Sequence, residues 1–370
     1  MLGSATVCEW ASERFELNRG GAAHNLRSME GLRGLAVFLV FLSHYGVLMR
    51  PWVTDDPRLL KLIPGLMNLG GSGVDLFFLL SGFLIYGSLI RREQPFMPYF
   101  KRRLARLYPA FAVVFALYVA LSFAKPELSK IPAGVLPGLG YLGLNFAMLP
   151  GIVPVEPMIT VAWSLSYEIA YYLAIPAAIA VLGLRDWKPA GRVALFIGLF
   201  AIAIGAFGAL GGPVRMITFL GGVLLYEHIA RRPGQGPGSA LALGALLVGL
   251  LSTQFETTDK LTYVLRVALL CALFYLACWA SFGNPTGRFA RALCTTPLRW
   301  LGNMSYSYYL IHSLAIHGAL LGLGRVVPKE IQGPGFFFAF LPVMFAWTLV
   351  PSALLYLLVE RRYSLQPKSR

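Results

Sequence analysis

Apolar stretches of roughly 17–25 residues recur along almost the whole of this 370-residue chain. They constrain the fold more than any other feature, because each is long enough as a helix to cross about 30 Å of hydrocarbon. Charged residues make up 13% of the chain, whereas a soluble domain usually carries about a quarter. Backbone groups inside a bilayer must be hydrogen-bonded internally. The sequence therefore predicts an all-α polytopic membrane protein.

About ten transmembrane helices are predicted, and the stretch 134–148 is left open as a re-entrant segment, an interfacial segment or an eleventh span. The ten lie near 31–50, 72–90, 107–124, 159–182, 192–210, 214–230, 239–253, 263–282, 304–323 and 336–359. We interpret the chain as one membrane domain over 29–363, flanked by cytoplasmic segments over 1–28 and 364–370.

Lysines and arginines favour cytoplasmic loops. With the N-terminus inside, 22 of them lie on the cytoplasmic side and 9 outside, which predicts that both termini are cytoplasmic. The net charge of +15 resides in short clusters between apolar spans rather than on one amphipathic face, so nucleic acid is not an expected partner. Residues 1–28 show no apolar core followed by a small-residue cleavage site, so the first span is the expected anchor.

The first span contains Arg33 and His44. Eleven helical steps return to within about 20° of the starting direction, so these two residues share one helix face at different depths. A histidine is the side chain best suited to proton transfer near neutral pH, which makes His44 a candidate general base. A snorkelling arginine and a structural histidine are the alternative interpretation.

Two acidic residues lie inside predicted spans, where a charge is costly unless it has a partner. Asp75 follows a glycine-rich turn in the second span; it either takes part in the chemistry, caps the helix or pairs with a loop cation. Glu168 shares a face of the fourth span with Ser164 and Tyr172. Its expected partner is His44, the nearest in depth, and a structural bridge to an arginine or a tyrosine is the alternative.

A dense basic run comprises Lys101, Arg102, Arg103 and Arg106, next to the third span. Such a density suits the phosphates of a nucleotide-bearing donor. The basic run is explained equally well as a signal that orients the protein in the membrane, or as a surface that contacts anionic lipid headgroups.

The ninth span is a weaker candidate. One stripe of it carries Ser305, Tyr308, Tyr309 and His312, and His317 points away by about 140°. Aromatic stripes more often pack than catalyse, so His312 is of second rank. For Glu360, near the end of the tenth span, the default interpretation is a salt bridge that anchors the helix at the cytoplasmic membrane interface. The four cysteines lack metal-ligand spacing, and no metal is expected.

These residues lie in fragments that together resemble the acyltransferase-3 family of integral membrane acyltransferases. The fragments occur in family order over about residues 28–363: Arg33-x10-His44, GVDLFFLLSGFLI at 73–85, KRRLARLYP at 101–109, WSLSYE at 163–168, LGNMSYSYYLIH at 301–312 and VERR at 359–362. The resemblance implies that Arg33 and His44 match the family's essential pair and that Arg103 and Arg106 match its basic motif. It also implies a bacterial inner (plasma) membrane location and transfer of acyl groups onto extracytoplasmic molecules.

The expected reaction moves an acyl group, with acetyl as the expected group, from cytoplasmic acyl-CoA to a hydroxyl of a carbohydrate or glycosylated metabolite. In this hypothesis His44 is the base, Glu168 or Asp75 orients it, and the basic run with Arg33 holds the donor. Direct transfer and an acyl-histidine intermediate both remain open. A transporter or flippase, and a scaffold without activity, are the alternatives. The acceptor and the oligomeric state are not determined by the sequence.

Overall fold

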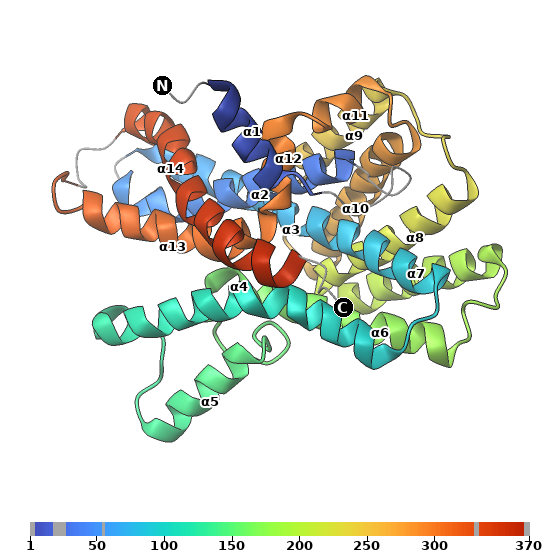
Figure 1. The fold of residues 1–370 in the computed structure, drawn as a ribbon, viewed down its shortest axis with the longest axis horizontal. Helices are drawn as coiled ribbons and strands as arrows, with labels where there is room; N and C mark the ends of the chain where they lie inside the picture. The colour runs from blue at the N-terminus through green and yellow to red at the C-terminus, as the bar shows by residue number, and fades with distance from the viewer. Residues whose placement is uncertain (1–3, 18–26, 54–55, 329–332, 366–370) are drawn as a thin grey trace. The chain divides into compact units, whose positions relative to one another are not determined.

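A computed structural model describes residues 4–17, 27–53, 56–328 and 333–365 (Figure 1). Within these residues the regular structure is helical, apart from one isolated bridge between Pro150 and Val153. This confirms the all-α prediction. The predicted segments 1–28 and 364–370 lie partly outside the described residues, and their separation from the membrane domain stays a prediction.

Seven described helices are long and apolar enough to cross a membrane. They are α2 (Arg27–Met49), α3 (Pro57–Arg91), α4 (Phe96–Ala124), α6 (Trp163–Val181), α7 (Pro189–Leu210), α10 (Lys260–Gly283) and α14 (Pro334–Leu355). The other three predicted spans are also helical, as α8 (Ile217–Arg231), α9 (Ser239–Ser252) and α13 (Ser305–Leu323). Shorter helices are α1 (Ser4–Phe15), α5 (Val135–Phe146), α11 (Arg288–Leu293) and α12 (Thr296–Asn303), and a π-helical segment, η7, covers Tyr356–Leu365.

Two helices are much longer than the spans predicted for them. Helix α3 begins at Pro57 rather than near residue 72, and α4 begins at Phe96 rather than near residue 107. The early part of α3 is itself largely apolar, and the helix continues through Pro64. For α4 the prediction followed apolar composition, whereas lysine and arginine are good helix formers and allow the helix to begin before its apolar part. The basic run is therefore part of α4 itself. The open stretch 134–148 contains α5, whose 12 residues rise only about 18 Å and fall short of the hydrocarbon thickness.

The chain forms two compact units. Unit 1 comprises Met1–Ser88, Asp186–Ser305 and Leu321–Met344, and unit 2 comprises Leu89–Arg185, Tyr306–Leu320 and Phe345–Arg370. Each unit is built from segments that are distant in sequence, so each depends on long-range helix packing.

In unit 1, α3 packs against α2 through glycines. A Cβ atom on Gly70 would lie 2.4 Å from the carbonyl oxygen of Leu39, and one on Gly73 would lie 2.4 Å from that of Ala36. Only glycine, which has no Cβ atom, allows the two backbones to approach this closely. Asp75 lies two positions after Gly73, about 200° around α3 from this contact, on the same face as Gly71, which meets Arg215.

In unit 2, polar contacts of α13 join it to its neighbours. The Tyr306 hydroxyl donates to the carbonyl oxygen of Leu107 on α4 at 2.8 Å, and the Tyr308 hydroxyl lies 2.7 Å from the hydroxyl of Thr348 on α14. Glu360 of η7 is buried, and its carboxylate accepts hydrogen bonds from the amide and the hydroxyl of Ser307. Glu360 thus closes the start of α13 instead of lying exposed at an interface, a pairing that sequence spacing does not indicate.

Candidate functional site

The predicted Arg33–His44 pair lies on one uninterrupted helix, α2. Because the helix is continuous, the two residues share a face as their spacing requires. Both side chains are half-buried, whereas Ala36, Val37 and Phe41 between them are fully buried. The Arg33 Nη2 atom donates a hydrogen bond to the Ser305 hydroxyl at 2.8 Å. The first residue of α13 therefore fixes the direction of the arginine.

Asp75 is buried and forms an ion pair with Arg215. Arg215 belongs to the short 3-10 turn Val214–Met216, and its Nη1 atom also donates to the carbonyl oxygen of Gly71 at 2.8 Å. Pairing with a loop cation, one of the alternatives that the sequence left open for Asp75, is thus the arrangement in the structure. A buried pair of this kind is costly to break, because removing one partner leaves an uncompensated charge. Any role of Asp75 in the chemistry stays a prediction.

Glu168 belongs to unit 2, where it accepts a hydrogen bond from a tyrosine of its own helix. The Tyr172 hydroxyl donates to the Glu168 carboxylate at 2.5 Å, as the alternative of a Glu–Tyr bridge anticipated. The guanidinium group of Arg103 lies 5.7 Å from the Tyr172 ring centre, and Arg106 also interacts electrostatically with Tyr172. Glu168 is therefore joined through Tyr172 to the basic face of α4.

The predicted partnership of Glu168 with His44 joins residues of different units, and it stays a prediction. Depth along two helices indicated that pairing, but depth carries no information on which helices are neighbours. The contact to the basic run of α4 was missed for the same reason.

The four cations of the basic run occupy the first half of α4. Lys101 and Arg102 are exposed, and Arg103 and Arg106 are half-buried. Arg102 donates to the side-chain oxygen of Gln94. Arg102 and Arg103 are four and three positions before Arg106, so each is a neighbour of Arg106 on the helix surface.

The second-rank candidate His312 is completely buried in unit 2. Its Nδ1 atom lies 2.9 Å from the carbonyl oxygen of Tyr308 and 3.0 Å from that of Tyr309, both in the preceding turn of α13. A carbonyl oxygen only accepts, so Nδ1 carries the proton. His317 is exposed, as its angular offset predicts. These positions favour a packing role for His312.

Sequence reasoning assigned no role to Arg215 and Ser305, although both contact predicted site residues. The signal for Arg215 was its position as a lone cation at the start of a predicted span. Ser305 lay on the noted stripe of the ninth span. In the described part of the chain, no group of three or more histidine, cysteine, aspartate or glutamate side chains is arranged to hold a metal ion.

Comparisons with known proteins give the class. The model of the acyltransferase-3 family, described as an acyltransferase domain, matches residues 26–357. The acyltransferase MdmB of Streptomyces mycarofaciens is 26% identical over 369 residues, which covers 90% of each chain. The exopolysaccharide production protein ExoZ of Rhizobium meliloti is 28% identical, covering 70% of this chain and 81% of that protein. The O-acetyltransferase OatA of Staphylococcus aureus is 25% identical, covering 78% of this chain and 50% of that protein. No solved structure matches.

The apolar helices and these matches together define an integral membrane acyltransferase. The chain belongs to the acyltransferase-3 family, because the family model covers most of its length. The resemblance of the sequence fragments is thereby confirmed, and the alternatives of a transporter and an inactive scaffold are set aside.

Proposed function

We propose that this enzyme transfers an acyl group, with acetyl as the expected group, from cytoplasmic acyl-CoA to a hydroxyl of an extracytoplasmic carbohydrate or glycosylated metabolite. The observation that carries the proposal is the Arg33–His44 pair, which lies on one continuous helix of an acyltransferase. Arg33 is held in place by Ser305. The relatives support the acceptor class, since one is named for exopolysaccharide production and another for O-acetyl transfer.

His44 is the proposed general base. It removes the proton as the acceptor oxygen attacks the thioester carbonyl carbon; the new C–O bond forms, the C–S bond breaks, and the proton passes to the leaving sulfur. In an acyl-histidine route the same imidazole forms the bond to the acyl carbon first. Glu168 or Asp75 is the proposed orienting carboxylate. Each of these carboxylates already has a partner within its own unit, Arg215 for Asp75 and Tyr172 for Glu168.

The basic run of α4 is the proposed site for the donor's phosphates. Lys101 and Arg102 present exposed cations, and Arg103 lies over the rings of Tyr99 and Tyr172 at 5.5 and 5.7 Å. Stacking on aromatic rings reduces the freedom of a guanidinium group before a ligand arrives. A helix surface prepared in this way suits several phosphate oxygens at once. Arg33 is the proposed further contact to the donor.

The proposed orientation places both termini and the basic run in the cytoplasm of a bacterium with the protein in its inner membrane. A cysteine introduced at position 103 is then protected from a membrane-impermeant thiol reagent in intact cells. Labelling of that cysteine from outside would show the opposite orientation. It would also exclude the basic run as a binding site for cytoplasmic acyl-CoA.

The reaction itself is tested with purified protein in lipid nanodiscs. Acetyl-CoA and an extract of envelope glycans from a strain lacking the gene are supplied, and both thiol release and the mass of the glycans are followed. We expect thiol release together with an acetyl mass increment on an acceptor, and neither with the His44→Ala variant. Thiol release without any acetylated hydroxyl, or an acceptor acetylated on nitrogen, would overturn the proposed acceptor class.

A further inference from the structure

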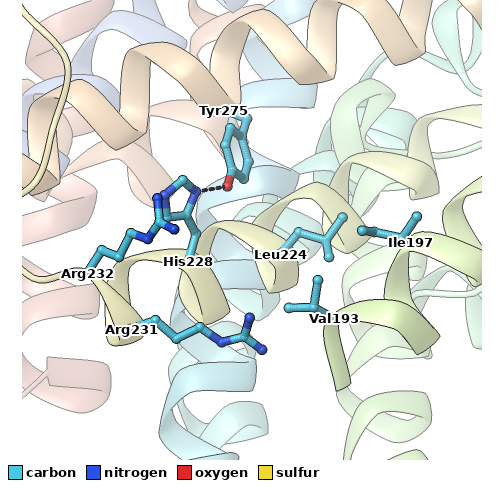
Figure 2. Close-up of a pocket in the computed structure, with 7 residues that line it drawn as sticks. All are labelled: Val193, Ile197, Leu224, His228, Arg231, Arg232 and Tyr275. Carbon is cyan, nitrogen blue, oxygen red and sulfur yellow. Dashed lines mark hydrogen bonds between the residues drawn. The ribbon is translucent and has the colours of Figure 1, made fainter. Parts of the chain in front are cut away.

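A cavity in unit 1, lined by residues other than those discussed above, has a wall that changes from aliphatic to cationic side chains (Figure 2). Its volume is about 390 Å³, within the usual range of ligand pockets. The lining consists of Val193 and Ile197 from α7, Leu224 and His228 from α8, Tyr275 from α10, and Arg231 and Arg232 at the end of α8. Figure 2 shows the three aliphatic side chains on one side and the two arginines on the other. The cavity is thus apolar at one end and cationic at the other.

The apolar end opens to the outside of unit 1. The Ile197 side chain is 54% exposed, and only 6% of the most apolar 18-residue stretch of α7 is buried. Helix α7 is long and apolar enough to cross a membrane, so the surroundings of this exposed face are lipid chains. The apolar end of the cavity is therefore on a face of unit 1 that suits contact with lipid chains.

The cationic end lies where α8 finishes. Arg231 is the last residue of α8 and Arg232 follows it, and both are exposed. Among the residues that the structure describes, no carboxylate forms an ion pair with either arginine. Glu227 is close in sequence, but its carboxylate accepts hydrogen bonds from Arg192 and Tyr86. The positive charge of the cavity mouth is therefore not balanced from within the protein.

The backbone that carries these arginines is fixed. Trp279 of α10 donates from its indole nitrogen to the carbonyl oxygen of Gln235 at 2.8 Å, and the amide of Gly236 donates to the carbonyl oxygen of Gly283 at 3.0 Å. His228 is hydrogen-bonded through Nδ1 to the Tyr275 hydroxyl, and its ring centre lies 4.3 Å from that of Trp279. The cavity wall is thus formed before a ligand binds, which lowers the entropic cost of binding.

We propose that this cavity binds an anionic phospholipid. Its phosphate would contact Arg231 and Arg232, and the upper part of an acyl chain would lie along Val193, Ile197 and Leu224. A phospholipid has the same change from a charged headgroup to apolar chains over a short distance. Basic pockets between membrane helices are suited to anionic headgroups. A free phosphate compound would use the arginines but leave the aliphatic wall without a partner.

The test uses the full-length protein in mild detergent, with equimolar phosphatidylglycerol and phosphatidylcholine of identical acyl chains. Native mass spectrometry then counts the lipids that the protein retains. We expect a preference for phosphatidylglycerol that falls roughly tenfold or more in the Arg231→Gln/Arg232→Gln variant, because each arginine near the surface favours an anionic lipid. The matched control, Arg288→Gln/Arg291→Gln, removes the same charge from exposed positions on α11 and should keep the preference.

A second variant and a competition arm complete the test. Val193→Trp fills the apolar end without changing the charge, so it should lower the retention of both lipids. Glycerol phosphate and inorganic phosphate, which lack acyl chains, should not displace the bound phosphatidylglycerol, and neither should acetyl-CoA. Three results would each overturn the proposal: an unchanged preference in the Arg231→Gln/Arg232→Gln variant, an equal loss in the control, or displacement by any of the chain-free phosphates or by acetyl-CoA.

Discussion

The ion pairs of the two units differ in how deeply they are buried. In unit 1, buried or nearly buried carboxylates are paired with arginines, in Asp75–Arg215, Glu30–Arg299 and Glu227–Arg192. In unit 2, the pairs Lys125–Glu127 and Lys130–Glu156 have carboxylates that are both well exposed, and the buried Glu360 accepts hydrogen bonds from Ser307. The densest group of cations in unit 2, the start of α4, includes the exposed Lys101 and Arg102.

This difference separates charges that hold the fold from charges that remain available. A buried pair fixes how helices pack, because loss of one partner leaves a charge that water does not reach. An exposed cation adds little to stability but keeps its capacity to bind an anion. We therefore expect substitutions in the buried pairs of unit 1 to act on folding, and substitutions in the basic run of unit 2 to act on substrate binding. His44 is the test of whether unit 1 also contributes chemistry.

The largest expected effect is that of His44→Ala. Loss of a positioned general base typically lowers the rate by about 10²–10⁴, while acyl-CoA binding should persist. Turnover of acetyl-CoA measures it, with thermal stability in detergent as the check on folding. His317→Ala, at an exposed position of α13, is the matched control and should leave turnover unchanged. Near-normal turnover by a well-folded His44→Ala enzyme would exclude the proposed base.

A double variant decides which partner Glu168 serves. If Glu168 orients His44, Glu168→Gln should lower turnover alone but change it little in the His44→Ala background, because two residues that act as one unit are not additive. If Glu168 instead supports the basic run through Tyr172, Glu168→Gln should raise the KM for acyl-CoA. The two outcomes assign this carboxylate to one role or the other.

The second effect is on stability. Replacing either Asp75 or Arg215 by leucine should cost about 3–5 kcal/mol, because the remaining charge is buried without a partner. Lys125→Ala breaks an exposed pair and should cost about 1 kcal/mol or less. Denaturant unfolding of the purified variants provides the comparison, and equal costs for the two pairs would contradict the contrast between the units.

The double variant Asp75→Leu/Arg215→Leu separates structure from chemistry at the same pair. Apolar residues can replace a buried ion pair with little loss of stability, so we expect the double variant to regain most of the stability. If Asp75 has only a structural role, activity returns with stability. A stable double variant that remains inactive would give Asp75 a part in catalysis.

The third effect concerns donor binding. Arg106→Gln should raise the KM for acetyl-CoA about tenfold or more, since a charge-assisted hydrogen bond contributes about 1.5–3 kcal/mol. Stability should change little. Arg58→Gln, an exposed position on α3 in unit 1, is the control and should leave the KM as it was. An unaltered KM for Arg106→Gln would reduce the basic run to an orientation signal.

The smallest effect is that of salt. Raising the ionic strength from about 0.1 M to 1 M shortens the screening length from about 10 Å to about 3 Å. The KM for acetyl-CoA should therefore rise a few-fold through the exposed cations of α4. The contribution of the Asp75–Arg215 pair to the free energy of unfolding should stay nearly constant, because salt screens buried pairs much less than exposed ones. A salt-sensitive contribution from that pair would contradict its assignment as buried.

The sequence by itself determined the fold class, the ten helical segments and the shared face of Arg33 and His44. These follow from local physics, since apolar length sets which segments can cross a bilayer and a fixed helical period relates residues within one helix. Family membership was also readable from six fragments in order. The starts of α3 and α4 were not, because α3 continues through Pro64 and α4 extends into its basic run.

Only the tertiary structure decided which residues are partners. Arg215 lies 140 positions from Asp75, and Ser305 lies 272 positions from Arg33. The connection of Glu168 to α4 through Tyr172 and the grouping of Arg231 with Val193 around one cavity likewise join residues of different helices. A helical period gives the direction and depth of a side chain on its own helix, but it does not identify the neighbouring helix. Apolar helix faces resemble one another in lipid, so small residues and polar contacts from distant segments select the packing.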